Sequence, residues 1–154
     1  MKHQLRYEQV LHAPMDKVWD FFTDASNLGK LTPKEMNMKV ISKMSDNRIF
    51  QGMKISYFIS PILMIPIFWQ TEIITIEDRK QFIDIQRIGT FKLWKHTHSF
   101  IEKEEGVRMI DEVEYILPFG RFGNMFNDAL VLKNLQDLFK FRAEICDELF
   151  NSKN

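Results

Sequence analysis

The sequence predicts an α+β fold in which an antiparallel sheet of about seven strands curves around a long C-terminal helix. Three observations predict it: a β-like run followed by short helical segments, a middle region of short alternating runs, and a last third with helical periodicity. The 154 residues are enough for one hydrophobic core. Since we find no repeat and no linker, we expect one domain over residues 1–154.

The N-terminal elements consist of one strand and two short helices. Residues 3–11 form an alternating strand pattern. Pro14 then opens a helix that runs to Phe22 and carries Asp16 in its first turn. A second short helical turn is expected over residues 24–30.

The middle of the chain is a meander of short strands. The alternating runs are 36–44, 52–59, 67–77, 81–89, 94–103 and 107–117. Because short turns connect them, runs that are consecutive in the sequence are expected to be neighbours in the sheet.

The last element is a long helix that follows Pro118-Phe119-Gly120. Its apolar positions form one stripe of Met125, Ala129, Leu132, Phe139, Ala143 and Cys146, with Val131, Leu135, Leu138, Ile145 and Leu149 beside it. Its charged residues are expected on the solvated side: Lys133, Asp137, Lys140, Arg142 and Glu144. The broad apolar face requires a cover, which the sheet supplies.

Symmetric hairpin turns predict which side chains share the inner face of the sheet. Four cross-strand rows result: Trp69, Ile88, Trp94 and Tyr115; Thr71, Gln86, His96 and Val113; Ile73, Asp84, His98 and Asp111; Thr75, Phe82, Phe100 and Met109. The other side of run 94–103 shows the polar pattern of a solvated face. Polar groups mixed with aromatic rings on an inner face are costly in a plain core and suit a ligand cavity.

Composition excludes several classes of protein. Hydrophobic residues make up 45% and charged residues 27%, as in an ordinary globular protein. The 21 basic and 21 acidic residues cancel, so no strong positive field attracts a phosphate backbone, and no nucleic-acid partner is expected. The lone Cys146 excludes an intrachain disulfide and is expected to be a buried thiol.

The sequence also predicts a cytoplasmic location. Residues 1–8 lack the apolar core of a signal peptide, and no run reaches the roughly 18 apolar residues that a spanning helix needs. The most apolar stretch, around Pro61–Pro66, is short and broken by two prolines. We expect no stable membrane insertion there, but packing over the cavity mouth; a lid, a homodimer contact or a membrane contact are the alternatives.

Several motifs resemble the SRPBCC superfamily, which includes START-like and pollen-allergen-like proteins, and within it the bacterial ligand-binding and polyketide cyclase/dehydrase-like subgroup. The motifs are Ala13-Pro14-x-x-Lys17-Val18-Trp19-x-Phe21-Phe22-x-Asp24, Asn27-Leu28-x-x-Leu31-Thr32-Pro33, Phe82-x-Asp84-x-Gln86-x-x-Gly89, Trp94-x-His96-x-His98-x-Phe100 and Asp111-x-Val113-x-Tyr115-x-x-Pro118. The resemblance covers nearly the whole chain. It implies a helix-grip fold with a deep hydrophobic cavity, whose members bind lipids, sterols or polyketides, act as cyclases or dehydratases, or bind a chaperone.

The function expected first is non-enzymatic binding, transport or sensing of a small hydrophobic molecule. The ligand-binding candidates are Tyr57, Trp69, Thr71, Asp84, Gln86, Trp94, His96, His98, Phe100, Asp111 and Tyr115. The second reading is an enzyme of the cyclase or dehydratase kind, in which His98 with Asp84 or Asp111 transfers protons. A third is a protein-binding adaptor.

The paired histidines admit a further alternative. His96 and His98 project to one side of a strand about 7 Å apart, so they have the spacing of two metal ligands, with Asp84 or Asp111 as a third. Neutral imidazoles hydrogen-bonded to carboxylates explain the same residues, and we expect neither a metal nor a cofactor.

Overall fold

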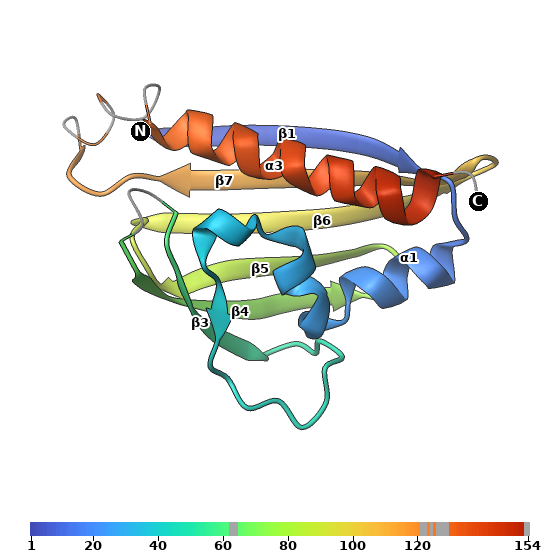
Figure 1. Cartoon of the computed structure of the whole chain (residues 1–154), viewed down its shortest axis with the longest axis horizontal. Helices are drawn as coiled ribbons and strands as arrows, with labels where there is room; N and C mark the ends of the chain where they lie inside the picture. Colours follow the sequence, from blue (N-terminus) through green and yellow to red (C-terminus); the bar gives the residue numbers. More distant parts are fainter. Residues whose placement is uncertain (62–64, 121–122, 124, 126–129, 153–154) are drawn as a thin grey trace.

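The computed structural model describes residues 1–61, 65–120, 123, 125 and 130–152. In chain order the elements are β1 (Lys2–Leu11), α1 (Met15–Phe22), the 3-10 helices η1 (Ala25–Leu31) and η2 (Lys34–Met36), β2 (Lys39–Val40), β3 (Lys54–Ile59), β4 (Ile67–Glu77), β5 (Gln81–Ile88), β6 (Leu93–Lys103), β7 (Gly106–Ile116), α3 (Leu132–Cys146) and the π-helical turn η4 (Asp147–Asn151) (Figure 1). The predicted α+β class is confirmed.

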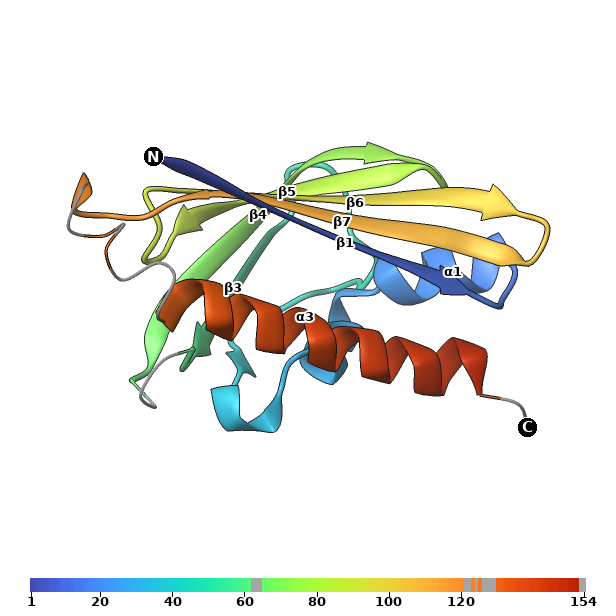
Figure 2. The ribbon, with the colours of Figure 1, turned by 90° about the horizontal axis from the view of Figure 1, so that it is seen from above.

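One seven-stranded antiparallel sheet has the order β1-β7-β6-β5-β4-β3-β2. Its strands are consecutive except that β1 pairs with β7, as expected for a meander whose first strand lies beside its last. Figure 2 shows α3 lying along one face of the sheet, with α1 and the 3-10 helices on the same side. That side is the inner face.

Local chemistry explains where the short helices begin. Pro14 precedes α1 with φ −59°, the angle that its ring imposes. Because proline has no backbone N–H, it leaves no unpaired donor at the start of the helix. The side chain of Asp24 accepts a hydrogen bond from the backbone N–H of Ser26 at 2.9 Å and caps η1. Both helices therefore lie within a residue or two of the predicted ranges.

The strand predicted over residues 36–44 is wrong in extent, because only Lys39–Val40 pair with β3. The backbone N–H groups of Ile41 and Ser42 both donate to the carbonyl of Ser56, after which the chain leaves the sheet. The next residues form a turn in which Asp46 accepts from the backbone N–H of Arg48 at 2.9 Å.

The predicted rows are confirmed between β6 and β7, where Trp94, His96, His98 and Phe100 lie opposite Tyr115, Val113, Asp111 and Met109. Between β4 and β5 two predicted pairs are confirmed, Thr71 with Gln86 and Ile73 with Asp84. Register irregularities on either side of these pairs displace the outer two, so Gln70 rather than Trp69 lies opposite Ile88. Ile88 is 50% exposed, contrary to its predicted place inside.

The predicted register between β5 and β6 is wrong by two residues. Asp84 lies opposite His96, where Gln86 was expected, and Phe82 lies opposite His98, where Asp84 was expected. Nε2 of Gln86 donates to the carbonyl of Phe91 at 2.7 Å, and Oε1 of Gln86 accepts from the backbone N–H of Phe91 at 3.3 Å. These two hydrogen bonds make the loop between β5 and β6 asymmetric. Because the register shift is an even number of residues, every side chain still faces the predicted side of the sheet.

The apolar face predicted for the terminal helix is confirmed in its second half except at Leu149, which is 44% exposed. Leu135, Phe139 and Cys146 are buried, and Phe150 of η4 continues the buried side. Met125 is 74% exposed and does not belong to the stripe, while Ala129 lies outside the described residues. In the part of the chain that the structure describes, none of the helices has the length and apolar character needed to cross a membrane.

Cys146 is expected to resist alkylation while the protein is folded. The residue has no exposed surface, and burial, reinforced by the nearby carboxylate of Asp111, raises the pKa of its thiol to about 12. Because the thiolate is the nucleophile, iodoacetamide at pH 8.5 should leave the native protein unmodified and label it fully in denaturant, as read by mass spectrometry. Rapid labelling of the native protein would contradict this burial.

Gly106→Ala is expected to cost about 2 to 3 kcal/mol in the free energy of unfolding. Gly106 follows the turn between β6 and β7 with φ +140°, and a Cβ there would lie 2.1 Å from the carbonyl oxygen of Leu11. Gly29→Ala is the control, since a Cβ at Gly29 meets nothing within 4 Å. Denaturant titration should show the large change at Gly106 only; equal changes at both positions would refute the argument.

Candidate functional site

A cavity of about 340 Å³ lies on the inner face of the sheet. Residues of β3 to β6 line one side, and residues of α1, η1 and α3 line the other. The apolar wall includes Phe21, Phe22, Leu28, Leu31, Ile49, Ile55, Ile59, Ile73, Leu135 and Leu138. The terminal helix thus leaves a space over the sheet.

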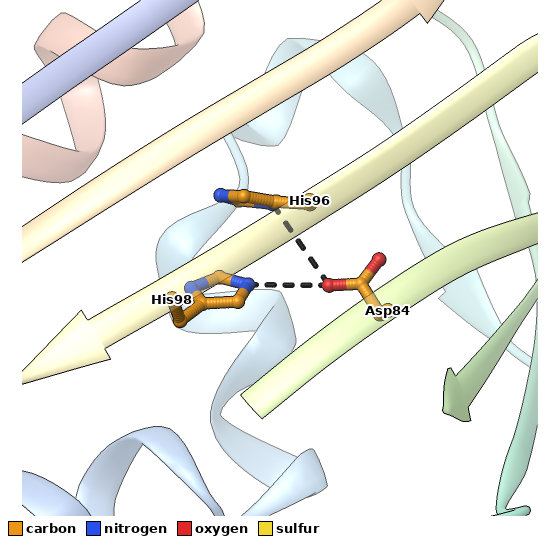
Figure 3. Close-up of side chains that lie close together, drawn as sticks. All are labelled: Asp84, His96 and His98. Atoms are coloured by element: carbon orange, nitrogen blue, oxygen red, sulfur yellow. Dashed lines mark hydrogen bonds and ion pairs between the residues drawn. The ribbon is translucent and has the colours of Figure 1, made fainter. Parts of the chain in front are cut away.

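Asp84, His96 and His98 also line this cavity, and Asp111 lies against the two histidines. Alternation along β6 puts both imidazoles on the inner face, while Asp84 comes from β5 and Asp111 from β7. Figure 3 shows the carboxylate of Asp84 directed at both rings. The four side chains therefore form one cluster of polar groups, here called the His–Asp cluster.

Each imidazole has one nitrogen near each carboxylate. Nε2 of His98 lies 3.2 Å from Oδ2 of Asp84, and Nδ1 of His96 lies 3.9 Å from the same oxygen. On the other side, Nε2 of His96 donates to Oδ1 of Asp111 at 3.0 Å. Nδ1 of His98 lies 2.8 Å from that oxygen but is not aligned for a hydrogen bond.

Aromatic contacts hold the two rings in place. The ring centroids of His96 and His98 lie 3.7 Å apart with planes tilted by 34°. Phe82 stacks on His98 at 4.1 Å, and Phe139 of α3 meets His96 edge-on at 5.6 Å. The cluster is therefore packed between the sheet and the terminal helix.

Burial and neighbouring charges divide the protons unequally within the His–Asp cluster. Burial and the adjacent His98 lower the pKa of His96 below 6.5. Burial opposes charge on His98 too, but the carboxylates of Asp111 and Asp84 outweigh it and raise the pKa of His98 to about 9. Burial likewise opposes charge on Asp111, yet both histidines hold its pKa well below 3.8. In the absence of a bound ion, His98 is the protonated histidine at neutral pH.

Seven of the predicted ligand-binding residues line the cavity, namely Tyr57, Trp69, Thr71, Asp84, Trp94, His96 and His98. Thr71 connects two of them, because its hydroxyl accepts from the indole Nε1 of Trp69 at 3.1 Å and lies 3.3 Å from the hydroxyl of Tyr57. These polar atoms are satisfied within the wall.

Four predicted residues lie outside the cavity wall that the structure describes. Gln86 braces the loop at Phe91. Phe100 packs in the core against Trp19. Tyr115 is fully buried near Trp94, and Asp111 lies behind the histidines.

Sequence reasoning missed Arg142, which it assigned to the solvated side of the helix. Arg142 is half-buried and lines the cavity, with Nε donating to the carbonyl of Leu31 at 3.1 Å. Its guanidinium also lies 5.3 Å from the ring centroid of Phe139. Its position one helical turn beyond Leu138 was the available signal. Lys133 and Asp137 are exposed as expected and lie 3.5 Å apart as an ion pair.

The stretch Pro61–Pro66 is described only at its ends, because residues 62–64 lie outside the described residues. Pro61 lines the cavity, and Ile65 is 58% exposed. The predicted place of this stretch over the cavity mouth stays a prediction.

Comparisons with known proteins give matches among solved structures. No family model matches the sequence. No curated protein matches it either. CV1439 from Chromobacterium violaceum superposes with a TM-score of 0.72 at 15% identity, covering 98% of this chain and 99% of that one.

Two further solved structures indicate the kind of fold. A START superfamily protein from Mycobacterium smegmatis has a TM-score of 0.68 at 12% identity, with 96% of this chain and 99% of that one covered. Ara h 8.0201 has a TM-score of 0.61 at 12% identity, with 95% and 98% covered. The fold that the sequence resemblance implied is therefore confirmed: this chain has the helix-grip fold of the START-like, SRPBCC proteins.

Proposed function

We propose that this protein binds a small, mostly apolar molecule in the cavity between the sheet and α3, with a polar group of that molecule directed at Asp84, His96 and His98. The observation that carries the proposal is an apolar cavity with a cluster of polar side chains in its wall. A few convergent polar groups in an otherwise apolar pocket are typical of small-molecule sites, because they fix the orientation of the ligand.

The size of the cavity supports a ligand of modest mass. Its volume of about 340 Å³ lies at the lower end of the range of small-molecule pockets, roughly 300 to 1,000 Å³. Burying about 300 Å² of apolar ligand surface would contribute roughly 7 kcal/mol before the cost of association is subtracted. The apolar wall can therefore supply most of the affinity, and the His–Asp cluster the specificity.

Recovery of a retained molecule tests this proposal. Protein purified without detergent is examined by native mass spectrometry, and its organic extract is compared with that of the heat-denatured protein. We expect an adduct with one molecule per chain or, where purification removes it, saturable binding of the neutral probe N-phenyl-1-naphthylamine at one site. A bare protein mass together with no probe binding would overturn the proposal.

Acid–base catalysis by His98 is the second candidate. The observation that favours it is the position of His98 in the cavity wall between two carboxylates, which raise its pKa to about 9 and let it act as an acid at neutral pH. With the recovered molecule as substrate, His98→Gln should abolish turnover if the protein is an enzyme. If it is a carrier or sensor, the same variant should change only affinity or stability.

A further inference from the structure

We propose that Asp84, His96 and His98 bind a divalent transition-metal ion such as Zn²⁺ at the side of the His–Asp cluster that faces the cavity. The three side chains offer two imidazole nitrogens and one carboxylate oxygen, all within 4.8 Å of one another. Two histidines and one carboxylate are a ligand set of catalytic zinc and non-haem iron sites.

Strand geometry brings the donor atoms together without a loop. His96 and His98 are alternate residues of β6, and Asp84 of β5 is the cross-strand partner of His96. Both strands are internal to the sheet, since β5 lies between β4 and β6, and β6 between β5 and β7. The backbone therefore fixes the positions of the three ligands before any ion arrives.

The distances are close to those of a tetrahedral site. Ligand atoms about 2.1 Å from zinc lie about 3.4 Å from each other at tetrahedral angles. Oδ2 of Asp84 lies 3.2 Å from Nε2 of His98 and 3.9 Å from Nδ1 of His96. Since all the donor atoms lie within 4.8 Å of one another, side-chain rotations that bring a pair closer by up to about 1.4 Å are enough to close the set around one ion.

Asp111 supplies the outer hydrogen-bonding partner that metal-binding histidines require. Its Oδ1 accepts from Nε2 of His96 at 3.0 Å and lies 2.8 Å from Nδ1 of His98. The hydrogen bond to Asp111 holds a proton on Nε2 of His96 and leaves its Nδ1, the atom near Asp84, as a lone pair. Nδ1 of His98 lies close to the same oxygen without an aligned hydrogen bond, so a rotation of that ring is needed before its proton is held there and Nε2 is free to bind the ion. A carboxylate hydrogen-bonded behind a metal-binding histidine fixes its tautomer and strengthens the ligand, and Asp111 is placed to do this for His96 in the structure as it stands.

Charge and chemistry select the kind of ion. Two carboxylates carry two negative charges, which one dication balances while both imidazoles stay neutral. Imidazole ligands favour zinc and other first-row transition metals over Mg²⁺ and Ca²⁺, which prefer oxygen ligands. Three protein ligands leave one tetrahedral position open, and because Asp84, His96 and His98 line the cavity, that position faces its interior.

Metal titration of the chelator-treated, dialysed protein tests the site. We expect Zn²⁺ to bind with one ion per chain by calorimetry, Co²⁺ to give the visible absorption of a tetrahedral site, and Mg²⁺ to give neither. Asp84→Asn and His96→Gln should each weaken Zn²⁺ binding at least tenfold, with circular dichroism confirming that the variants fold. The matched control His12→Gln removes an exposed histidine whose ring nitrogen Nδ1 lies 3.0 Å from the backbone carbonyl of Glu105, and should leave the affinity unchanged.

Weak, non-stoichiometric Zn²⁺ binding would overturn the metal site, as would equal loss in His12→Gln and His96→Gln. The proposal extends the proposed ligand binding, yet the two fail separately because the titration uses the metal alone. Binding of N-phenyl-1-naphthylamine without stoichiometric binding of Zn²⁺ would support the apolar ligand site and overturn the metal site. Stoichiometric Zn²⁺ binding would also occupy Nε2 of His98 and exclude that histidine as a general acid.

Discussion

Replacing Asp111 by alanine is expected to destabilise the protein by about 3 to 5 kcal/mol, since removing one partner of a buried ion pair strands the other. Asp111 is 6% exposed, contacts both histidines, and is the carboxylate nearest to His98. Its loss leaves the charge on His98 with Asp84 alone and removes the acceptor for Nε2 of His96. Urea titration with a chelator present measures the change in the free energy of unfolding.

The matched control for this prediction is the next residue of β7. Glu112 points to the other face, where it pairs with Arg6 at 2.7 Å with a third of its side chain exposed. Such a pair is worth less than about 1 kcal/mol, so Glu112→Ala should have little effect. A loss of less than 1 kcal/mol for Asp111→Ala would contradict the buried ion pair with His98 as a source of stability.

The double variant Asn134→Trp/Leu138→Trp is expected to weaken binding of N-phenyl-1-naphthylamine at least about thirtyfold, or roughly 2 kcal/mol. Both residues line the cavity from α3. Two indoles in place of an amide and an isobutyl group would occupy much of a space of about 340 Å³. Because the cavity is already open, the added rings displace the ligand rather than the core.

The control places the same two indoles on the outer side of the same helix. Gln136 and Lys140 are exposed and have the same four-residue spacing. Gln136→Trp/Lys140→Trp should bind the probe as the parent protein does. Equal affinity in the two double variants, with both folded by circular dichroism, would place the probe site outside the cavity.

Most of the fold could be predicted because it depends on local patterns. Strict alternation identified β4 at its observed bounds and set the inner face of β6, since successive side chains of a strand point to opposite faces. The histidine pair and both aspartates of the cluster follow from that facing. A register error of two residues between β5 and β6 left the inner set intact.

The remaining features depend on contacts that no local pattern shows. The loop at Phe91 is held by the amide of Gln86, five residues away. The short β2 is followed by a turn in which Asp46 accepts from the backbone N–H of Arg48. Arg142 lines the cavity because Leu31, more than a hundred residues earlier, supplies its acceptor. Charge spacing along the helix could not reveal this partner, since a solvated face and a cavity rim carry the same residue types.

Photo-crosslinking with an alkyl diazirine tests the site of ligand binding most directly. A diazirine-bearing fatty alcohol is irradiated with the native protein, and labelled residues are identified by peptide mass spectrometry with and without excess unlabelled alcohol. We expect competed labels on inner residues such as Leu31, Ile55 and Leu138. Competed labels confined to the outer face of β6, at Thr97, Ser99 or Ile101, would contradict an internal apolar site.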